Sequence, residues 1–380
     1  MKYQKYKYSI SFTLITVALL ILVFSCNSSV ENQKINLKWN KSYPSDTFTK
    51  NVIALKWCLS FLGSDLASDS ISKGISTDNQ KIISLNLNQL KFDKNASRYL
   101  QKLNSKLKKT EEYQKNNSVD LGRYIALTIG SSYHYYRIVN VPNKLEDYNS
   151  LYAFDSISGY IDNSSVSLVD RIISYSKYNN RREQAYISVE IDSITKEIFE
   201  YETVEVMNNG QLKFGIYDRN GNLKDVADNK ITMAGKPAKC IWCHETSIQP
   251  IFRKQKDHDG YLTFQKLQDT LDYYNKQLRS YQDSIWQDKE IRNKRLHTEM
   301  EISYIAFMEP SAEHLSNEWG ITIEEVKTKL HNLKTHRHHE FDFLGDLYHR
   351  REIDALAPWK TLEVPENIRE ESTNEINHIN

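Results

Sequence analysis

The chain has 380 residues, of which 39% are hydrophobic and 26% charged, with a formal net charge of +1 at pH 7. This apolar content is enough for a buried core, and the presence of only 12 Gly and 7 Pro excludes a collagen-like or low-complexity chain. Three lysines fall in the first seven residues. Without them acidic residues slightly outnumber basic ones, so no general nucleic-acid-binding surface is expected.

The N-terminal segment has the pattern of a secretory signal peptide. The three lysines precede an apolar run over residues 14–24, which ends just before Cys26. Such a run is shorter than the roughly 20 residues that a transmembrane helix needs, so we expect residues 1–25 to be removed on export. Residues 26–43 are polar, lack a clear period and are expected to form a tether.

Ser25 and Cys26 resemble the lipobox of bacterial lipoproteins. The resemblance implies that the Cys26 thiol carries a lipid anchor and becomes the new N-terminus. It further implies an exported chain. Because the residues after Cys26 include no evident Asp that would retain a lipoprotein at the inner membrane, we expect the chain to be held at the outer membrane and to face the periplasm. The alternative is an uncleaved N-terminal anchor with an incidental cysteine. Both interpretations attach the chain to a membrane.

Residues 44–148 have a helical pattern. Leu100, Leu103 and Leu107 recur at the spacing of one helix face. Cys58 lies in another apolar helical stretch of this region. We predict a buried, unreactive thiol there, because reactive cysteines need exposed and electropositive surroundings.

The period of the pattern changes within residues 149–230. Four apolar residues from Ala185 to Ile191 alternate with other residues, as in a strand with one buried face. Two further alternating runs follow, and each is succeeded by an Asn-Gly pair that favours a tight turn. We predict an antiparallel meander of about three strands that leads directly into the segment 231–260.

Residues 261–364 again have a helical pattern. A narrow stripe of apolar residues begins at Phe264, and a second stripe ends at Met308. We expect the two stripes to pair in an intramolecular helical hairpin, with dimerisation as the alternative. Residues 365–380 are expected to be a disordered tail. The predicted fold is therefore α+β and mostly helical, with a central antiparallel meander and a later helical hairpin.

The most specific motif is Cys240-Ile241-Trp242-Cys243-His244. Cys240 and His244 are four residues apart and so share one face of a helical turn, with Cys243 beside both. A redox-active disulfide has no need of the histidine and fits a βαβ context, whereas a meander precedes this pair. A structural zinc site needs a second ligand pair, and the sequence has no other cysteine pair. The motif therefore favours covalent haem attachment through both thiols.

This motif resembles that of the c-type cytochromes. The resemblance covers the motif and its immediate neighbours, and it implies one covalent haem c bound at Cys240 and Cys243, with His244 as the proximal iron ligand. It does not specify a fold, because many folds carry this motif. A meander that leads into the motif is also similar to cytochrome c-prime-beta, where a sheet covers the haem and leaves a distal pocket.

The sequence offers several distal ligands for the haem iron. Small cytochromes commonly supply a downstream methionine, and Met308 lies downstream of the motif in an apolar context. Met300 and Met233 are further candidates, although methionines on apolar stripes commonly pack in cores. An open distal position is one alternative, and a histidine from the cluster at 336–339 or His349 is another.

Two functions follow from a single haem. The first is electron transfer by a membrane-anchored monohaem cytochrome, with a partner protein or complex in the periplasm. The second is a haem enzyme or gas-binding protein with an open distal position, as in a peroxidase. About 100 residues suffice to enclose one haem, and the additional helical regions are most simply explained by docking into a larger complex. The sequence therefore favours electron transfer and leaves open whether the protein is an enzyme.

Overall fold

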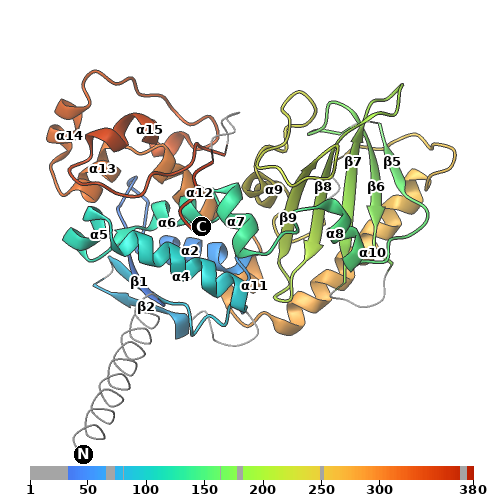
Figure 1. The fold of residues 1–380 in the computed structure, drawn as a ribbon. Helices are drawn as coiled ribbons and strands as arrows, with labels where there is room; N and C mark the ends of the chain where they lie inside the picture. The colour runs from blue at the N-terminus through green and yellow to red at the C-terminus, as the bar shows by residue number, and fades with distance from the viewer. Residues whose placement is uncertain are drawn as a thin grey trace, which may run out of the picture.

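The structure is a computed structural model that describes residues 33–65, 73–79, 81–162, 164–177, 183–248, 252–368 and 375–380. The predicted signal peptide and Cys26 lie outside these residues. The described chain has two parts (Figure 1). One part is mostly helical and contains a small sheet, and the other is built on a five-stranded sheet.

The structure divides into the following elements. The strands are β1 (Lys34–Lys38), β2 (Ile75–Asp78), β3 (Ile82–Asn86), β4 (Val119–Asp120), β5 (Gly159–Ile161), β6 (Asp170–Tyr175), β7 (Ala185–Ile191), β8 (Ile198–Val206) and β9 (Leu212–Asp218). The helices of the first half are α2 (Phe48–Phe61), α4 (Lys94–Lys108), α5 (Glu111–Asn116), α6 (Leu121–Thr128), α7 (Ser132–Ile138) and α8 (Leu145–Leu151). Those of the second half are α9 (Pro237–His244), α10 (Phe264–Ile285), α11 (Lys289–Lys294), α12 (Thr298–Met308), α13 (Ala312–Trp319), α14 (Ile323–Lys329) and α15 (Arg350–Ile353), with short 3-10 turns at Asp342–Leu344 and Asp354–Leu356.

The helical part is organised around α12, which packs against α2 and α6. Helix α6 can approach α12 this closely only because residue 122 is a glycine: a Cβ at Gly122 would lie 2.2 Å from Cβ of Phe307 on α12. The accompanying sheet has the order β2-β3-β1-β4, with β1 antiparallel to β3 and parallel to β4. Strand β1 lies inside the segment 26–43 that the sequence predicts to be a tether.

The second part is built on a five-stranded antiparallel meander. Its strands follow in chain order, β5-β6-β7-β8-β9, and every neighbouring pair is antiparallel. The prediction of an α+β fold with an antiparallel meander is confirmed. Strands β5 and β6 extend the meander beyond the three predicted strands, and α9 follows β9 through a loop.

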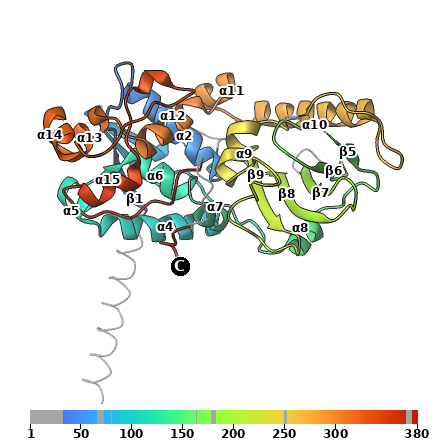
Figure 2. The same ribbon diagram turned by 90° about the horizontal axis from the view of Figure 1, so that it is seen from above.

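Helix α10 covers one side of the five-stranded sheet, and α8 lies on the other side (Figure 2). The apolar stripe of α10 is buried at Leu267, Leu271, Tyr274 and Leu278. The hydroxyl of Tyr274 donates to the carbonyl oxygen of the residue after β6, Ser176, at 2.6 Å. The partner of the stripe is therefore the sheet, whereas α12, the expected hairpin partner, packs in the helical part.

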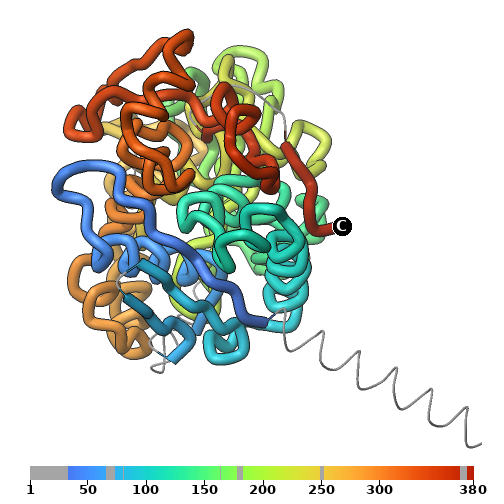
Figure 3. The backbone as a smooth tube through the Cα atoms, turned by 90° about the vertical axis from the view of Figure 1, so that its left-hand side faces the viewer, coloured from blue at the N-terminus to red at the C-terminus, as the bar shows by residue number. Residues whose placement is uncertain are grey.

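The C-terminal residues also pack on the helical part. Helices α13, α14 and α15 enclose a small separate core that includes Leu315 and Trp319. The last residues, 375–380, run alongside α4 and α7 (Figure 3), where Ile379 is fully buried. The described end of the chain is thus ordered, unlike the disordered tail that its composition suggests. No helix in the described part of the chain is both long enough and apolar enough to cross a bilayer.

Candidate functional site

Helix α9 carries the cysteine-histidine motif and lies where the two parts of the molecule meet (Figure 1). Pro237 occupies its first turn, where the fixed φ of proline suits the helix and no amide hydrogen is needed. The preceding residue, Lys236, is 1% exposed; its Nζ lies 2.6 Å from Oε1 of Glu375 and donates to the carbonyl of Glu366. Ile241 points into the core. The helix is therefore anchored at its start and along one face.

The opposite face of α9 borders a pocket. Cys240, Cys243 and His244 all line it, so the structure brings together the three residues that the sequence singles out. The space not filled by protein atoms amounts to about 1120 Å³, part of it open to solvent. Cys243 is exposed and Cys240 partly buried, so the motif spans the pocket from its mouth inward.

The remaining walls come from the sheet, from α10, from the segment between β5 and β6, and from the loops before and after α9. Most of their side chains are apolar, namely Val166, Ile173, Ile187, Val204, Ile248, Phe252 and Leu271. Concave sites lined mainly by apolar side chains with a few polar groups are typical of small-molecule and cofactor binding. The shape and lining of this pocket suit a large apolar group held against α9.

A charged group sits on the sheet wall. Arg171 on β6 and Glu190 on β7 are register partners, and Nε of Arg171 lies 2.8 Å from Oε1 of Glu190. Nη2 of Arg171 lies 3.5 Å from Oε2 of Glu202 on β8. Arg171 and Glu202 line the pocket together with Ser188, and Glu190 lies behind them, 0% exposed.

Glu190 has a perturbed pKa in this group. Burial and the nearby charge of Glu202 raise the pKa of Glu190 to about 7, although Arg171 opposes the shift. Ser167 and Ser188 donate hydrogen bonds to Glu190 at 2.6 and 2.9 Å. The carboxyl of Glu190 is thus held in place and exchanges a proton near neutral pH.

His244 has the chemistry of a neutral metal ligand. Burial, with a further contribution from the charge of Arg171, lowers the pKa of His244 to about 4. The imidazole is therefore uncharged at pH 7, as metal ligation requires. Its Nδ1 is buried and has no hydrogen-bond partner among the residues that the structure describes. The ring lies 5.7 Å from the ring of Phe214, between centroids.

The two thiols of the motif are free and have raised pKa values. Cys240 and Cys243 are not disulfide-bonded. Burial, followed by the charge of Glu202, raises the pKa of Cys240 well above its usual value, and burial also raises the pKa of Cys243. Redox-active CxxC pairs have thiols of lowered pKa, so the pocket counts against that alternative.

The predicted distal ligand is not in this pocket. Met308 is 5% exposed and lines a different pocket, together with His349 and Arg350. Met300 is completely buried in the core. Met233, by contrast, lines the pocket of His244, where it is 54% exposed.

The histidine cluster lies elsewhere. The ring of His336 stacks on that of His349 with 4.3 Å between centroids, and its Nε2 lies 2.8 Å from Oε2 of Glu309. His338 is buried and stacks on Phe341. None of these histidines lines the pocket of His244. Of these histidines, His336 contacts Glu309, the residue that follows α12.

Of the remaining two cysteines, Cys58 and Cys26, only Cys58 lies among the described residues. Cys58 is completely buried, and burial raises its pKa to about 12, which agrees with the predicted unreactive thiol. Cys26, the predicted lipidation site, lies outside the described residues.

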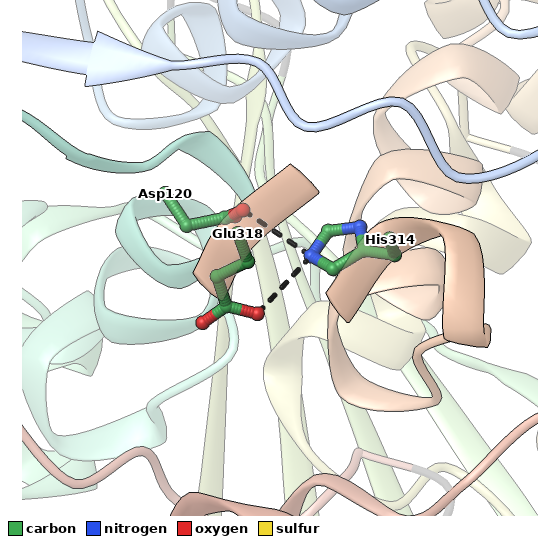
Figure 4. A group of neighbouring side chains, drawn as sticks. All are labelled: Asp120, His314 and Glu318. Carbon is green, nitrogen blue, oxygen red and sulfur yellow. Dashed lines mark ion pairs between the residues drawn. The ribbon is translucent and has the colours of Figure 1, made fainter. Parts of the chain in front are cut away.

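Asp120, His314 and Glu318 form a second cluster of groups that can bind metals, and Figure 4 shows both carboxylates directed at the imidazole. Nε2 of His314 lies 3.2 Å from Oδ2 of Asp120 and 3.5 Å from Oε2 of Glu318. Arg350 donates to both oxygens of Glu318, at 3.0 and 2.9 Å. The carboxylates are therefore already neutralised by cations of the chain.

The protonation state of His314 also argues against metal binding by this cluster. Burial alone lowers the pKa of this imidazole, but Asp120 and Glu318 outweigh burial and raise it to about 9. An imidazolium at neutral pH does not bind a cation. Nδ1 of His314 is also engaged, at 2.7 Å from Oγ of Ser42. This cluster is an ion-pair network that joins α13 and α15 to α6.

Comparison of the chain with protein-family models, with curated proteins and with solved structures found no match. The interpretation of the pocket therefore depends on the residues that line it.

Proposed function

We propose that the chain is an exported c-type cytochrome that holds one haem in the pocket between α9 and the five-stranded sheet. The observation that carries the proposal is the joint presence of Cys240, Cys243 and His244 in one pocket with mostly apolar walls. The two thiols would attach the haem covalently, and the neutral imidazole of His244 would ligate its iron. When bound, the haem would supply electron transfer or the binding of a small ligand.

Polar groups of the pocket are also consistent with haem. Arg171 and Lys239 line it and bring two positive charges to an otherwise apolar site. Haem carries two carboxylates, for which guanidinium and ammonium groups are suitable partners. A buried redox disulfide or a zinc site gives no reason for so large an apolar wall.

Of the two uses of a haem, binding of a small ligand is better supported. Met308 lies in another pocket, and Met233 lines this pocket but is 54% exposed. The wall provided by β6, β7 and β8 consists of aliphatic residues, Tyr186, Arg171, Ser188 and Glu202. An iron bound only by His244 leaves one coordination position for a ligand from solution. We therefore infer a gas-binding or peroxidase-like haem protein.

Electron transfer to a periplasmic partner is the second candidate. The exposure of Cys243 at the pocket mouth favours it, because a haem joined there would have one edge near the surface. Membrane attachment through a lipid on Cys26 would place the protein beside membrane-bound redox partners. Export agrees with haem attachment, since c-type cytochromes mature outside the cytoplasm.

The decisive experiment tests whether haem becomes covalently attached to the chain. The full chain should be produced with a cytochrome c maturation system and examined on haem-stained denaturing gels. We expect a stained band for the wild type and for Cys58→Ala, which removes a cysteine outside the pocket. The double variant Cys240→Ala/Cys243→Ala should lose the stain. A wild-type protein that stays unstained would contradict the proposal.

A further inference from the structure

The tripeptide Asp-Ser-Ile occurs four times in the chain, beginning at Asp69, Asp155, Asp192 and Asp283. The copy at Asp69 lies outside the described residues. Two of the other copies lie in exposed bends or turns of the part built on the five-stranded sheet, and the third lies in helix α10. The same three side chains can therefore be compared in different surroundings.

The two exposed copies have the same local geometry. In the segment before β5, Oδ1 of Asp155 accepts a hydrogen bond from the amide of Ile157 at 3.1 Å. In the turn between β7 and β8, Oδ1 of Asp192 accepts one from the amide of Ile194 at 2.8 Å. Each aspartate thus closes a small turn with the backbone two residues on. The serine between them is held in the same way in both turns.

The serine and isoleucine of both turns are accessible. Ser156 and Ser193 are exposed, and neither hydroxyl is hydrogen-bonded to a described residue. Ile157 is 48% and Ile194 87% exposed, and they are the only isoleucines among the exposed large apolar side chains of the described chain. A single exposed apolar residue is ordinary on a protein surface. Two at the same position of one tripeptide, each beside a free hydroxyl, indicate a sequence that another protein recognises.

The third copy is hidden from such recognition. Near the end of α10, Oγ of Ser284 donates to the carbonyl oxygen of Tyr281 at 2.6 Å. The carboxylate of Asp283 is paired with Arg295, and Ile285 packs against the main hydrophobic core. The hydroxyl, the carboxylate and the aliphatic side chain are therefore all engaged within the fold. This copy is a natural control for the other two.

The two exposed turns are far apart on the sheet. The amide of Asp155 donates to the carbonyl oxygen of Tyr175, the last residue of β6. Asp170, the first residue of β6, is the register partner of Ile191, which precedes Asp192. The turns therefore lie toward opposite ends of β6, and neither lines the pocket of the cysteine-histidine motif. Each serine is a separate accessible site.

We propose that Ser156 and Ser193 are acceptors of O-linked sugars, added by a transferase that recognises Asp-Ser-Ile in an exposed turn. The serine oxygen forms a bond to the anomeric carbon of a lipid-linked sugar diphosphate. The bond from that carbon to the diphosphate breaks, the diphosphate leaves with the electron pair, and the hydroxyl proton passes to a base of the transferase. This inference rests on the proposed export, because the nucleoside triphosphates that kinases use are supplied in the cytoplasm. It does not depend on the haem.

The test is peptide mass spectrometry of the full chain isolated from the membranes of the organism that makes it, with fragmentation that keeps side-chain modifications attached. We expect the peptides with Ser156 and Ser193 to carry the mass of one or more sugars, and the peptide with Ser284 to be unmodified. The double variant Ser156→Ala/Ser193→Ala should lose both modifications and keep its fold, since both side chains are exposed. The matched control Ser284→Ala should keep both.

Unmodified Ser156 and Ser193 in a membrane-bound, lipidated chain would overturn the inference while leaving the proposed export intact. A phosphate at these serines would also overturn it, because the transferred group would not be a sugar. Equal modification of Ser284 would overturn the requirement for an exposed turn. A chain recovered from the cytoplasm without lipid would contradict the proposed export and this inference together. Haem staining of the wild type is independent of all these results.

Discussion

Nζ of Lys236 lies 2.6 Å from Oε1 of Glu375, in an ion pair whose two side chains are 1% and 6% exposed. The pair joins the residue just before α9 to the C-terminal segment. Oγ of Ser131 also donates to this carboxylate, at 2.8 Å. Three segments that are distant in the sequence therefore meet at the start of the motif helix and set its position relative to the pocket.

We expect Lys236→Met to lower the free energy of unfolding by about 3–5 kcal/mol, because it leaves Glu375 buried without its cation. Chemical denaturation of the variant measures this loss. The double variant Lys236→Met/Glu375→Leu should recover much of it, since neither charge then remains buried. Lys239→Met, on the pocket side of the same helix, serves as the control. Unchanged stability in Lys236→Met would show that the pair contributes nothing.

Met308 should prove to be a core residue and not an iron ligand. We expect Met308→Ala to lower the free energy of unfolding by about 2–5 kcal/mol through the cavity that it creates. Carbon monoxide should bind the reduced wild type readily and bind Met308→Ala with the same affinity, as followed by optical spectroscopy. Binding that appears only in Met308→Ala would identify Met308 as the distal ligand and favour the electron carrier.

The ion-pair network around His314 should make stability depend on alkaline pH. The pKa of His314 is raised to about 9, so its protonated form stabilises the fold fully below the ordinary pKa near 6.5. This contribution is lost as the pH rises through about 9. We expect the free energy of unfolding to fall between pH 7 and pH 10, as measured by urea denaturation at each pH.

The variant His314→Gln provides the comparison for that pH dependence. It should be less stable than the wild type at pH 7 by about 3 kcal/mol, because Asp120 and Glu318 lose a buried cation. It should also lose the part of the alkaline decline that belongs to His314. A decline of the same size in both proteins would assign it to other groups.

Lipid attachment is expected at Cys26. Labelled palmitate should be incorporated by the wild-type chain, and Cys26→Ala should abolish the label and move the protein to the soluble fraction. Cys58→Ala is the matched control and should remain labelled, because its thiol is buried in the fold. Equal labelling of wild type and Cys26→Ala would exclude the lipoprotein interpretation.

The sequence by itself determined the local features of this protein. The spacing of Cys240, Cys243 and His244 places them on one helical face, which local geometry alone requires. The change from helical to alternating periodicity predicted an α+β fold with a meander before the motif. Both follow from contacts between residues close in the chain, and the structure agrees with them in the fold and in the joint position of the three residues.

Only the tertiary structure decided which surfaces meet. The narrow stripe of α10 fits another helix or a sheet equally well, and the sheet is its partner because β5 and β6 widen it. Arg171 and Glu202 reach one pocket through the registers of three strands, which interleaved glutamates in a sequence do not reveal. Register and partner choice depend on pairing across long separations, and a one-residue shift would turn these side chains to the opposite face.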